Sequence, residues 1–146
     1  MTPLKITSSA FKSNGPIPKK YTCDGIDVNP PLSIEGLPKQ TVSLVLIVDD
    51  PDAPRGTWVH WVVWNIPPLR VIQEDSVPGT EGVNDFQRHS YGGPCPPSGT
   101  HRYFFKVYAL DTKLQLDQNA GKKDVEKAME GHILAMGELV GLYSRG

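Results

Sequence analysis

The chain has 146 residues, the size of one compact domain, and we expect a single domain over residues 1–146. Its composition is 38% hydrophobic and 21% charged, which is too apolar for a disordered chain. The net charge is −1 and no basic stripe is present, which argues against a nucleic-acid-binding surface.

The N-terminal sequence and the turn-forming residues narrow the class of protein further. No window approaches the roughly 18 apolar residues that a membrane span needs. Residues 1–11 hold no apolar core long enough for a signal peptide, so we expect a cytoplasmic protein. The 14 glycines and 14 prolines predict many turns between short strands.

The first half of the chain predicts strands separated by loops. Prolines punctuate the first forty residues, so we expect mostly loop there, with a brief strand at Leu4–Thr7. Residues 42–48 are a nearly unbroken apolar run rich in β-branched side chains, which is typical of a strand buried on both faces. Residues 58–66 predict another strand, which ends at Pro67 because proline cannot donate to a strand ladder.

The second half predicts a long loop, one strand and a C-terminal helix. Residues 69–100 are rich in Gly, Pro, Asp and Ser, and a loop of this length is commonly functional or disordered. A strand follows at residues 101–110. From Asp124, taken as the N-cap, apolar residues spaced by three and four as far as Tyr143 predict a helix packed on the core. We expect a core role for His132, which falls near this stripe.

Two histidines stand at the start of predicted strands. A single histidine on an apolar strand face is commonly a core residue with one hydrogen bond. Two of them, each beside a proline-stiffened loop, favour a pocket at one end of a sheet. With a side-chain period of two, the residues sharing a face are Trp58, His60, Val62 and Trp64 in one strand and His101, Tyr103, Phe105 and Val107 in the other.

The loops beside these strands carry the other candidate groups. Asp50 precedes a proline, so its side chain either caps a turn or orients a histidine. Asp52 has the same two alternatives, and we favour the turn cap for it. Residues 92–99 either form a tight connection or let glycine N–H groups approach an oxyanion, with prolines fixing the loop in advance. N–H groups, imidazoles and the Tyr103 hydroxyl suit a phosphate or sulfate, so the second alternative predicts an anion pocket.

Two other kinds of site are compatible with the same residues. A hydrolase would use the Asp and His groups, but no Ser or Cys lies in a nucleophile elbow. A metal site built from His60, His101 and Asp50 has ligand types that suit zinc, although their spacing is nonlocal. Cys23 and Cys95 are either two reduced thiols or one disulfide, which requires Cα atoms within about 7 Å.

Four segments, in this order, carry a resemblance to a known family: Asp50-Pro-Asp-Ala-Pro54, Trp58-Val-His60-Trp61, Tyr91-Gly-Gly-Pro-Cys-Pro-Pro97 and His101-Arg-Tyr103. Together they resemble the phosphatidylethanolamine-binding protein family, which includes the Raf kinase inhibitor proteins. The similarity extends from residues 21–25 and 29–32 to residues 138–143, most of the chain. The chain is shorter than the animal proteins and has Cys95 in its Gly-Pro loop, features that resemble bacterial and archaeal members.

The resemblance implies a mainly β, antiparallel, sandwich-like domain with few helices, including the C-terminal one, and a small anion pocket. It implies a non-enzymatic binding protein without a cofactor, whose ligand is a phosphate-like anion or a phospholipid head group. It also implies inhibition or regulation of a serine protease or kinase, with a protease favoured for a prokaryote-type member, and it is compatible with a homodimer. The pocket residues that carry over are Asp50, Pro54, His60, Gly93, Pro96, Pro97, His101 and Tyr103.

Overall fold

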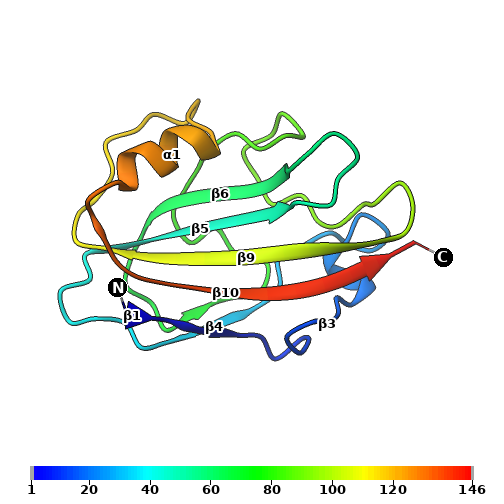
Figure 1. Ribbon diagram of the computed structural model, residues 1–146, viewed down its shortest axis with the longest axis horizontal. Helices are drawn as coiled ribbons and strands as arrows, with labels where there is room; N and C mark the ends of the chain where they lie inside the picture. The colour runs from blue at the N-terminus through cyan, green and yellow to red at the C-terminus, as the bar shows by residue number, and fades with distance from the viewer. Residues whose placement is uncertain (1, 146) are drawn as a thin grey trace.

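Four long strands form the centre of a seven-stranded sheet in the computed structural model, which describes residues 2–145. They are β5 (Ser43–Asp50), β6 (Trp58–Ile66), β9 (Thr100–Leu110) and β10 (Ile133–Ser144). Their order is β6-β5-β9-β10 and each neighbouring pair is antiparallel, as Figure 1 shows. The strands predicted at residues 42–48, 58–66 and 101–110 are therefore confirmed.

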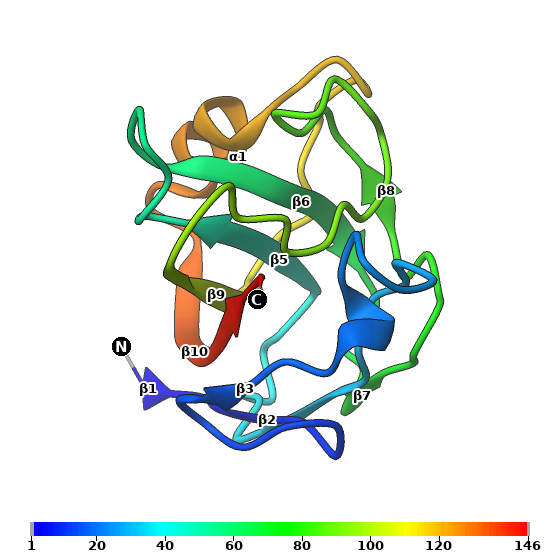
Figure 2. The ribbon, with the colours of Figure 1, turned by 90° about the vertical axis from the view of Figure 1, so that its right-hand side faces the viewer.

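A second, three-stranded sheet lies against one face of the first (Figure 2). The short elements of the chain are β1 (Thr2–Pro3), β2 (Lys5–Thr7), β3 (Gly15–Pro16), the 3-10 turn η1 (Lys19–Tyr21), β4 (Leu32–Glu35), β7 (Val71–Ile72) and β8 (Thr80–Glu81). The second sheet has the order β2-β4-β7, while β1 and β3 pair parallel to β10 and β8 pairs antiparallel to β6. The expected mainly β, sandwich-like fold is confirmed.

Strand β5 is buried on both faces, as its apolar run predicts. Leu46 and Val48 lie in the core cluster between the two sheets. Val45 and Ile47 lie in a second cluster, beneath the helix α1 (Lys122–Met129). Because each fully buried aliphatic side chain contributes about 1.5–3 kcal/mol, this strand is the central hydrophobic element of the fold.

The C-terminal helix is present but is shorter than the apolar pattern predicts. It begins after Gly121, whose backbone N–H donates to the Asp124 carboxylate at 3.0 Å, so Asp124 lies in the first turn and is not the N-cap. The predicted continuation to Tyr143 is wrong, because residues 133–144 form strand β10. Within residues 2–145, no helix is long and apolar enough to cross a membrane.

Tertiary packing explains why the end of the chain is a strand. A methyl group at Gly137 would overlap the Leu4 carbonyl oxygen, and one at Gly141 would overlap the Ile17 side chain. The glycines therefore let the N-terminal segment pass close to β10, and glycines in a helix would each cost about 1 kcal/mol. His132, expected in the core, is exposed in the turn before β10.

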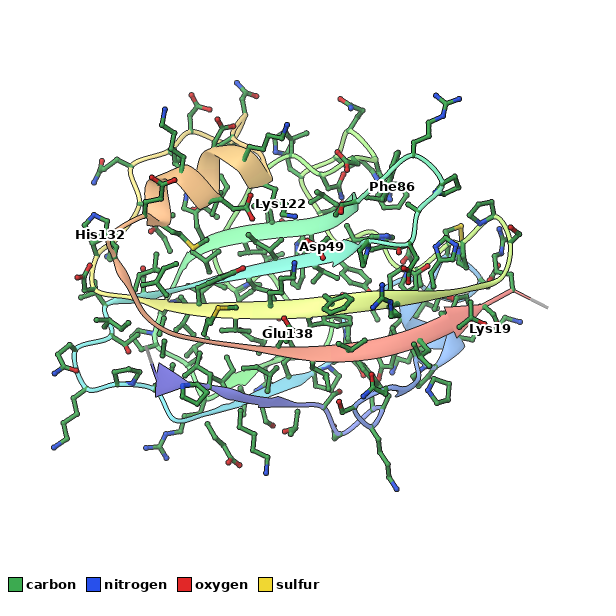
Figure 3. All side chains as sticks on the ribbon, viewed as in Figure 1. Lys19, Asp49, Phe86, Lys122, His132 and Glu138 are labelled. Atoms are coloured by element: carbon green, nitrogen blue, oxygen red, sulfur yellow. A yellow bond between two sulfur atoms is a disulfide. The ribbon has the colours of Figure 1, made fainter. Side chains whose placement is uncertain are left out.

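A buried carboxylate attaches α1 to the outer face of the sheet. Asp49 is 1% exposed and lies 2.8 Å from the Lys122 ammonium and 3.1 Å from that of Lys106. Figure 3 labels Lys122 beside the helix and Asp49 near the middle strands below it. Because the next residue, Asp50, points to the opposite face, β5 uses one carboxylate to hold the helix and the other at the candidate site.

Cys23 and Cys95 form a disulfide, with their Cα atoms 5.5 Å apart. The bond joins the loop after η1 to the Gly-Pro loop before β9, across a sequence separation of 72. Hydrogen bonds reinforce the same junction, because the Cys23 N–H donates to the Pro94 carbonyl and the Tyr91 hydroxyl to the Tyr21 carbonyl. The two loops are therefore held as one unit.

Reduction of this disulfide is expected to lower the free energy of unfolding by about 4 kcal/mol, because the bond closes a long loop in the unfolded chain. Urea unfolding with and without dithiothreitol measures the change. The double variant Cys23→Ala/Cys95→Ala should match the reduced protein and should not respond to the reductant. An unfolding midpoint that is the same in oxidised and reduced protein contradicts the prediction.

Candidate functional site

The antiparallel order of three strands brings the predicted site residues to one edge of the large sheet. Strand β5 lies between β6 and β9, so its C-terminal end adjoins the N-terminal ends of both neighbours. Asp50 pairs with Trp58, the first residue of β6. His101 and Tyr103 stand at the start of β9. The two predicted strand starts are therefore neighbours of the same central strand.

His60 is the extra residue of a β-bulge. Val48 pairs with Trp61 and the next residue, Asp49, pairs with Val59, so His60 has no partner in β5. The simple alternation predicted for β6 is therefore wrong, because Val62 and Trp64 pack under α1 on the opposite side from the site. Bulges are frequent next to functional sites because they redirect a side chain, and this one lets His60 point into the site.

The hydrogen bonds of His60 fix which of its nitrogens faces the cavity. Its Nδ1 lies 2.7 Å from the Gly92 carbonyl oxygen, which only accepts, so Nδ1 carries a hydrogen. The backbone carbonyl of His60 accepts from Gly92 N–H and from the Asn84 amide. Burial lowers the pKa of His60 below its ordinary value of 6.5 and so favours the neutral ring. Nε2 then presents a lone pair, with no hydrogen-bond partner among residues 2–145.

His101 is oriented by Asp50. Its Nδ1 lies 2.6 Å from Asp50 Oδ2, and both side chains are nearly buried. The other oxygen of Asp50 accepts the Asp52 N–H at 2.7 Å, so the carboxylate is held on both sides. Asp52 itself points away and forms a forked ion pair with Arg102, whose hydrogen bonds lower the pKa of Asp52 to about 2. Asp50 therefore lies in the cavity wall, while Asp52 stabilises the turn through Arg102, as predicted for these two residues.

Tyr103 brings a third polar group without a protein partner. The residue is 1% exposed, and its hydroxyl has no hydrogen-bond partner among the described residues. Burial, followed by the nearby Asp50 carboxylate, raises the pKa of Tyr103, while the Cys95 backbone lowers it, so the hydroxyl keeps its proton. The Asp50 carboxylate and the Cys95 backbone are close to the hydroxyl, but neither meets hydrogen-bond geometry with it. The ring centroid lies 5.3 Å from that of His60 and 6.4 Å from that of His101. An unsatisfied buried hydroxyl costs about 1–3 kcal/mol, which indicates a place for a ligand atom.

These side chains line a cavity of about 230 Å³ at the edge of the sheet. Figure 3 shows the position of Phe86, one of its wall residues, beyond the ends of β5 and β6. The cavity is small and mainly apolar with a few convergent polar groups, as ligand pockets commonly are. The lining residues are Asp50, Ala53, Pro54, Trp58, His60, Phe86, Cys95, Pro96, Pro97, His101 and Tyr103.

The structure places all but one of the sequence-predicted site residues in the cavity wall. The exception is Gly93, whose N–H donates to the Asp27 carboxylate at 2.8 Å instead of facing the cavity. A side chain at Gly93 would overlap the Tyr21 carbonyl, so the glycine serves the junction between the loops. Four wall residues were not predicted for the site: Ala53, Trp58, Phe86 and Cys95. Of these, Trp58 carried a signal, as an aromatic residue two positions before His60 in the same strand.

The unpartnered polar atoms of the cavity can form hydrogen bonds with a small polar ligand. Cys95 is bound in the disulfide, so its sulfur is not a free nucleophile. No group of three His, Cys, Asp or Glu side chains arranged to hold a metal ion occurs within residues 2–145. The groups left are His60 Nε2, His101 Nε2 and the Tyr103 hydroxyl, which become three donors when both rings are protonated.

Curated relatives cover nearly the whole chain. The UPF0098 protein PH1269 of Pyrococcus horikoshii is 56% identical over 97% of this chain and 77% of its own length. The UPF0098 protein of Methanothermobacter thermautotrophicus is 50% identical over 98% of this chain and 100% of its own.

Solved structures share the fold. A crystal structure described as a phosphatidylethanolamine-binding protein homolog, CT736 from Chlamydia trachomatis, is 40% identical with a TM-score of 0.95, covering 100% of both chains. YbcL of E. coli, described as a member of the mammalian PEBP family, is 31% identical with a TM-score of 0.90, covering 98% of this chain and 99% of its own. The family model for phosphatidylethanolamine-binding proteins matches residues 7–144. The chain therefore belongs to the phosphatidylethanolamine-binding protein family.

Proposed function

We propose that this chain is a non-enzymatic binding protein whose cavity takes a phosphate-like anion, either free or as a head group. The observation that carries the proposal is the convergence of His60 Nε2, His101 Nε2 and the Tyr103 hydroxyl on one small cavity without protein partners. Such groups suit the oxygens of a tetrahedral anion. From the family likeness we extend the proposal to a regulatory role, as an inhibitor of a protease or kinase.

Anion binding in this cavity is coupled to proton uptake. In the free protein the neutral His60 ring presents a lone pair, which repels an anionic oxygen. The anion therefore binds with a proton on Nε2, and the buried ring is stabilised in its charged form by the ligand. The carboxylates of Asp50 and Asp27 also favour that proton, while burial opposes it.

A second candidate function rests on the Asp50–His101 pair, which could act as an oriented base in a small hydrolase. This alternative predicts turnover of p-nitrophenyl phosphate or p-nitrophenyl acetate that is lost in His101→Asn. Binding without turnover is the result expected for the first proposal.

Phosphate is expected to stabilise the protein against heat. At 100 times its dissociation constant it should add about 2.7 kcal/mol, or roughly 5–10 °C in Tm for a chain of this size. The variants His60→Asn and His101→Asn keep an amide donor near the Nδ1 position and remove Nε2. Each should weaken binding by roughly tenfold to a hundredfold, the value of one charge-assisted hydrogen bond. Calorimetric titration with phosphate measures the constants.

The matched control is His132→Asn. His132 also holds a carboxylate with Nδ1, 2.8 Å from Asp111, but it is exposed and is not a cavity residue. It should bind phosphate as the wild type does. If all three variants keep the wild-type affinity, phosphate acts through general salt effects and the pocket proposal is wrong.

Tyr103→Phe is expected to change stability and affinity in opposite directions. Removing the unpartnered hydroxyl should leave the ligand-free protein as stable as the wild type, or more stable by about 1 kcal/mol. Phosphate affinity should fall by roughly tenfold. Urea unfolding in phosphate-free buffer and calorimetry provide the two readouts. A loss of stability with unchanged affinity would indicate a purely structural hydroxyl.

Sulfate affinity is expected to rise as the pH falls. Because the pKa of His60 is depressed in the free protein and raised in the complex, binding takes up a proton between those two values. The rise should therefore begin near the raised pKa of the complex and level off only below the depressed pKa of the free ring, in a range where sulfate itself does not titrate. Calorimetry from about pH 8 to about pH 5 follows it, and His60→Asn should make the slope of the profile shallower than in the wild type. If sulfate affinity changes with pH to the same extent in the wild type and in His60→Asn, His60 is not the group that takes up the proton.

A further inference from the structure

The disulfide between Cys23 and Cys95 is attached to the wall of the cavity. Cys95 lines the cavity together with Pro96 and Pro97, whereas Cys23 lies outside it in the loop after η1. Because the bond spans 72 positions in the sequence, it joins this wall to a segment that is remote along the chain. Breaking the bond would therefore change how one wall of the cavity is held.

The Gly-Pro loop is held in two different ways along its length. The backbone of residues 92–94 is hydrogen-bonded to the start of β6 and to the loop after η1. Residues 95–99, which we call the wall segment, form no hydrogen bond within residues 2–145, and strand pairing resumes only at Thr100. The wall segment nevertheless supplies Cys95, Pro96 and Pro97 to the cavity. The disulfide is therefore the main tether of the wall segment.

The surroundings of the disulfide allow it to open and to close again. Both cysteines are partly exposed, so a reductant can reach the sulfur atoms. The Cys23 N–H donates to the Pro94 carbonyl and the Tyr91 hydroxyl donates to the Tyr21 carbonyl. These hydrogen bonds do not involve sulfur, so reduction does not remove them. They keep the two thiols close together, and the bond can form again when the reductant is withdrawn.

We propose that this disulfide is a redox switch for the cavity: the oxidised protein binds the anion, and reduction releases the wall segment and weakens binding. The inference rests on the proposed anion-binding function and adds a means of regulating it. The reductant is a dithiol.

The exchange with the dithiol balances in two steps. In the first step, one thiolate of the reductant forms a bond to a sulfur of the protein while the bond between Cys23 and Cys95 breaks. In the second step, the other thiolate of the reductant displaces the protein sulfur from the mixed disulfide. Two electrons and two protons pass to the protein, which gains two thiols, and the reductant becomes a disulfide.

Reduction should weaken phosphate binding by roughly tenfold, as expected if the released wall segment occupies its place in the cavity about a tenth of the time. Binding is weakened and not abolished, because His60 keeps its hydrogen bond to Gly92. Calorimetric titration with phosphate measures the constants of the oxidised and the dithiothreitol-reduced protein. Trimethylamine N-oxide in both samples favours the folded state. Circular dichroism checks that the reduced protein is folded.

Two variants separate the tether from general stability. Cys23→Ser removes the bond from outside the cavity and leaves every wall residue unchanged. It should match the reduced wild type in phosphate affinity and should not respond to dithiothreitol. The matched control is Val125→Ala. Val125 is fully buried beneath α1 and is not a cavity residue, so this variant loses stability with its disulfide intact. It should bind phosphate as the wild type does.

Thermodynamic linkage provides a second measurement on the wild type alone. If the oxidised form binds phosphate tenfold more tightly, saturating phosphate must favour the disulfide over the dithiol by the same factor. For a two-electron couple this factor lowers the reduction potential of the disulfide by about 30 mV. Equilibration in mixtures of reduced and oxidised dithiothreitol, followed by thiol trapping and mass spectrometry, measures the shift. Chloride at the same ionic strength is the control and should leave the potential unchanged.

Each result separates the redox switch from the function beneath it. Wild-type affinity in folded, reduced protein or in Cys23→Ser overturns the switch and leaves the anion pocket standing. An equal loss of affinity in Val125→Ala overturns it as well, because the loss then reports general stability. A reduced protein that stays unfolded in trimethylamine N-oxide also overturns it, since the bond is then purely structural. No binding of phosphate by the oxidised protein overturns the proposed function and this inference together.

Discussion

The extra residue in strand β6 is the constraint on which the candidate site depends. Without the bulge, a regular strand that kept Val62 and Trp64 beneath α1 would also turn His60 to that side. The bulge turns this one side chain into the cavity while the apolar residues after it keep their places. The bulge interrupts the strand ladder, and hydrogen bonds compensate for this. The imidazole N–H of His60 donates to the Gly92 carbonyl, and its backbone carbonyl accepts from the Gly92 N–H and the Asn84 amide.

The same hydrogen bonds connect the site to the rest of the fold. Gly92 belongs to the loop that Cys95 ties to Cys23, and that loop forms one wall of the cavity. On the other side, Asp50 is held by His101 and by the turn after β5. A pocket whose walls are fixed before a ligand arrives loses little conformational entropy on binding. Its unpartnered polar atoms are the energetic cost of that preorganisation, and the anion that we propose would satisfy them.

Much of this arrangement could be predicted from the sequence, because it depends on local pattern. The apolar run at residues 42–48 predicts a strand buried on both faces, and the spacing of His101 and Tyr103 correctly places both on one face. The predictions that proved wrong concern features that depend on contacts between residues far apart in the sequence. The apolar spacing after Met129 fits a helix equally well. Pairing with β9, together with the close passage of Leu4 and Ile17 over glycines, makes it a strand. Likewise, no residue near Gly93 in the sequence indicates that its N–H donates a hydrogen bond to the distant Asp27 carboxylate.

The most direct measurement of the central claim is the protonation of the histidine rings, by ¹⁵N NMR of imidazole nitrogens at neutral pH with and without phosphate. We expect free His60 to be neutral, with the proton on Nδ1 and no proton on Nε2. On saturation with phosphate, both nitrogens of His60 should carry protons, while the exposed His132 should not change. A His60 ring that stays neutral and unshifted at saturating phosphate would show that the cavity binds no anion through His60.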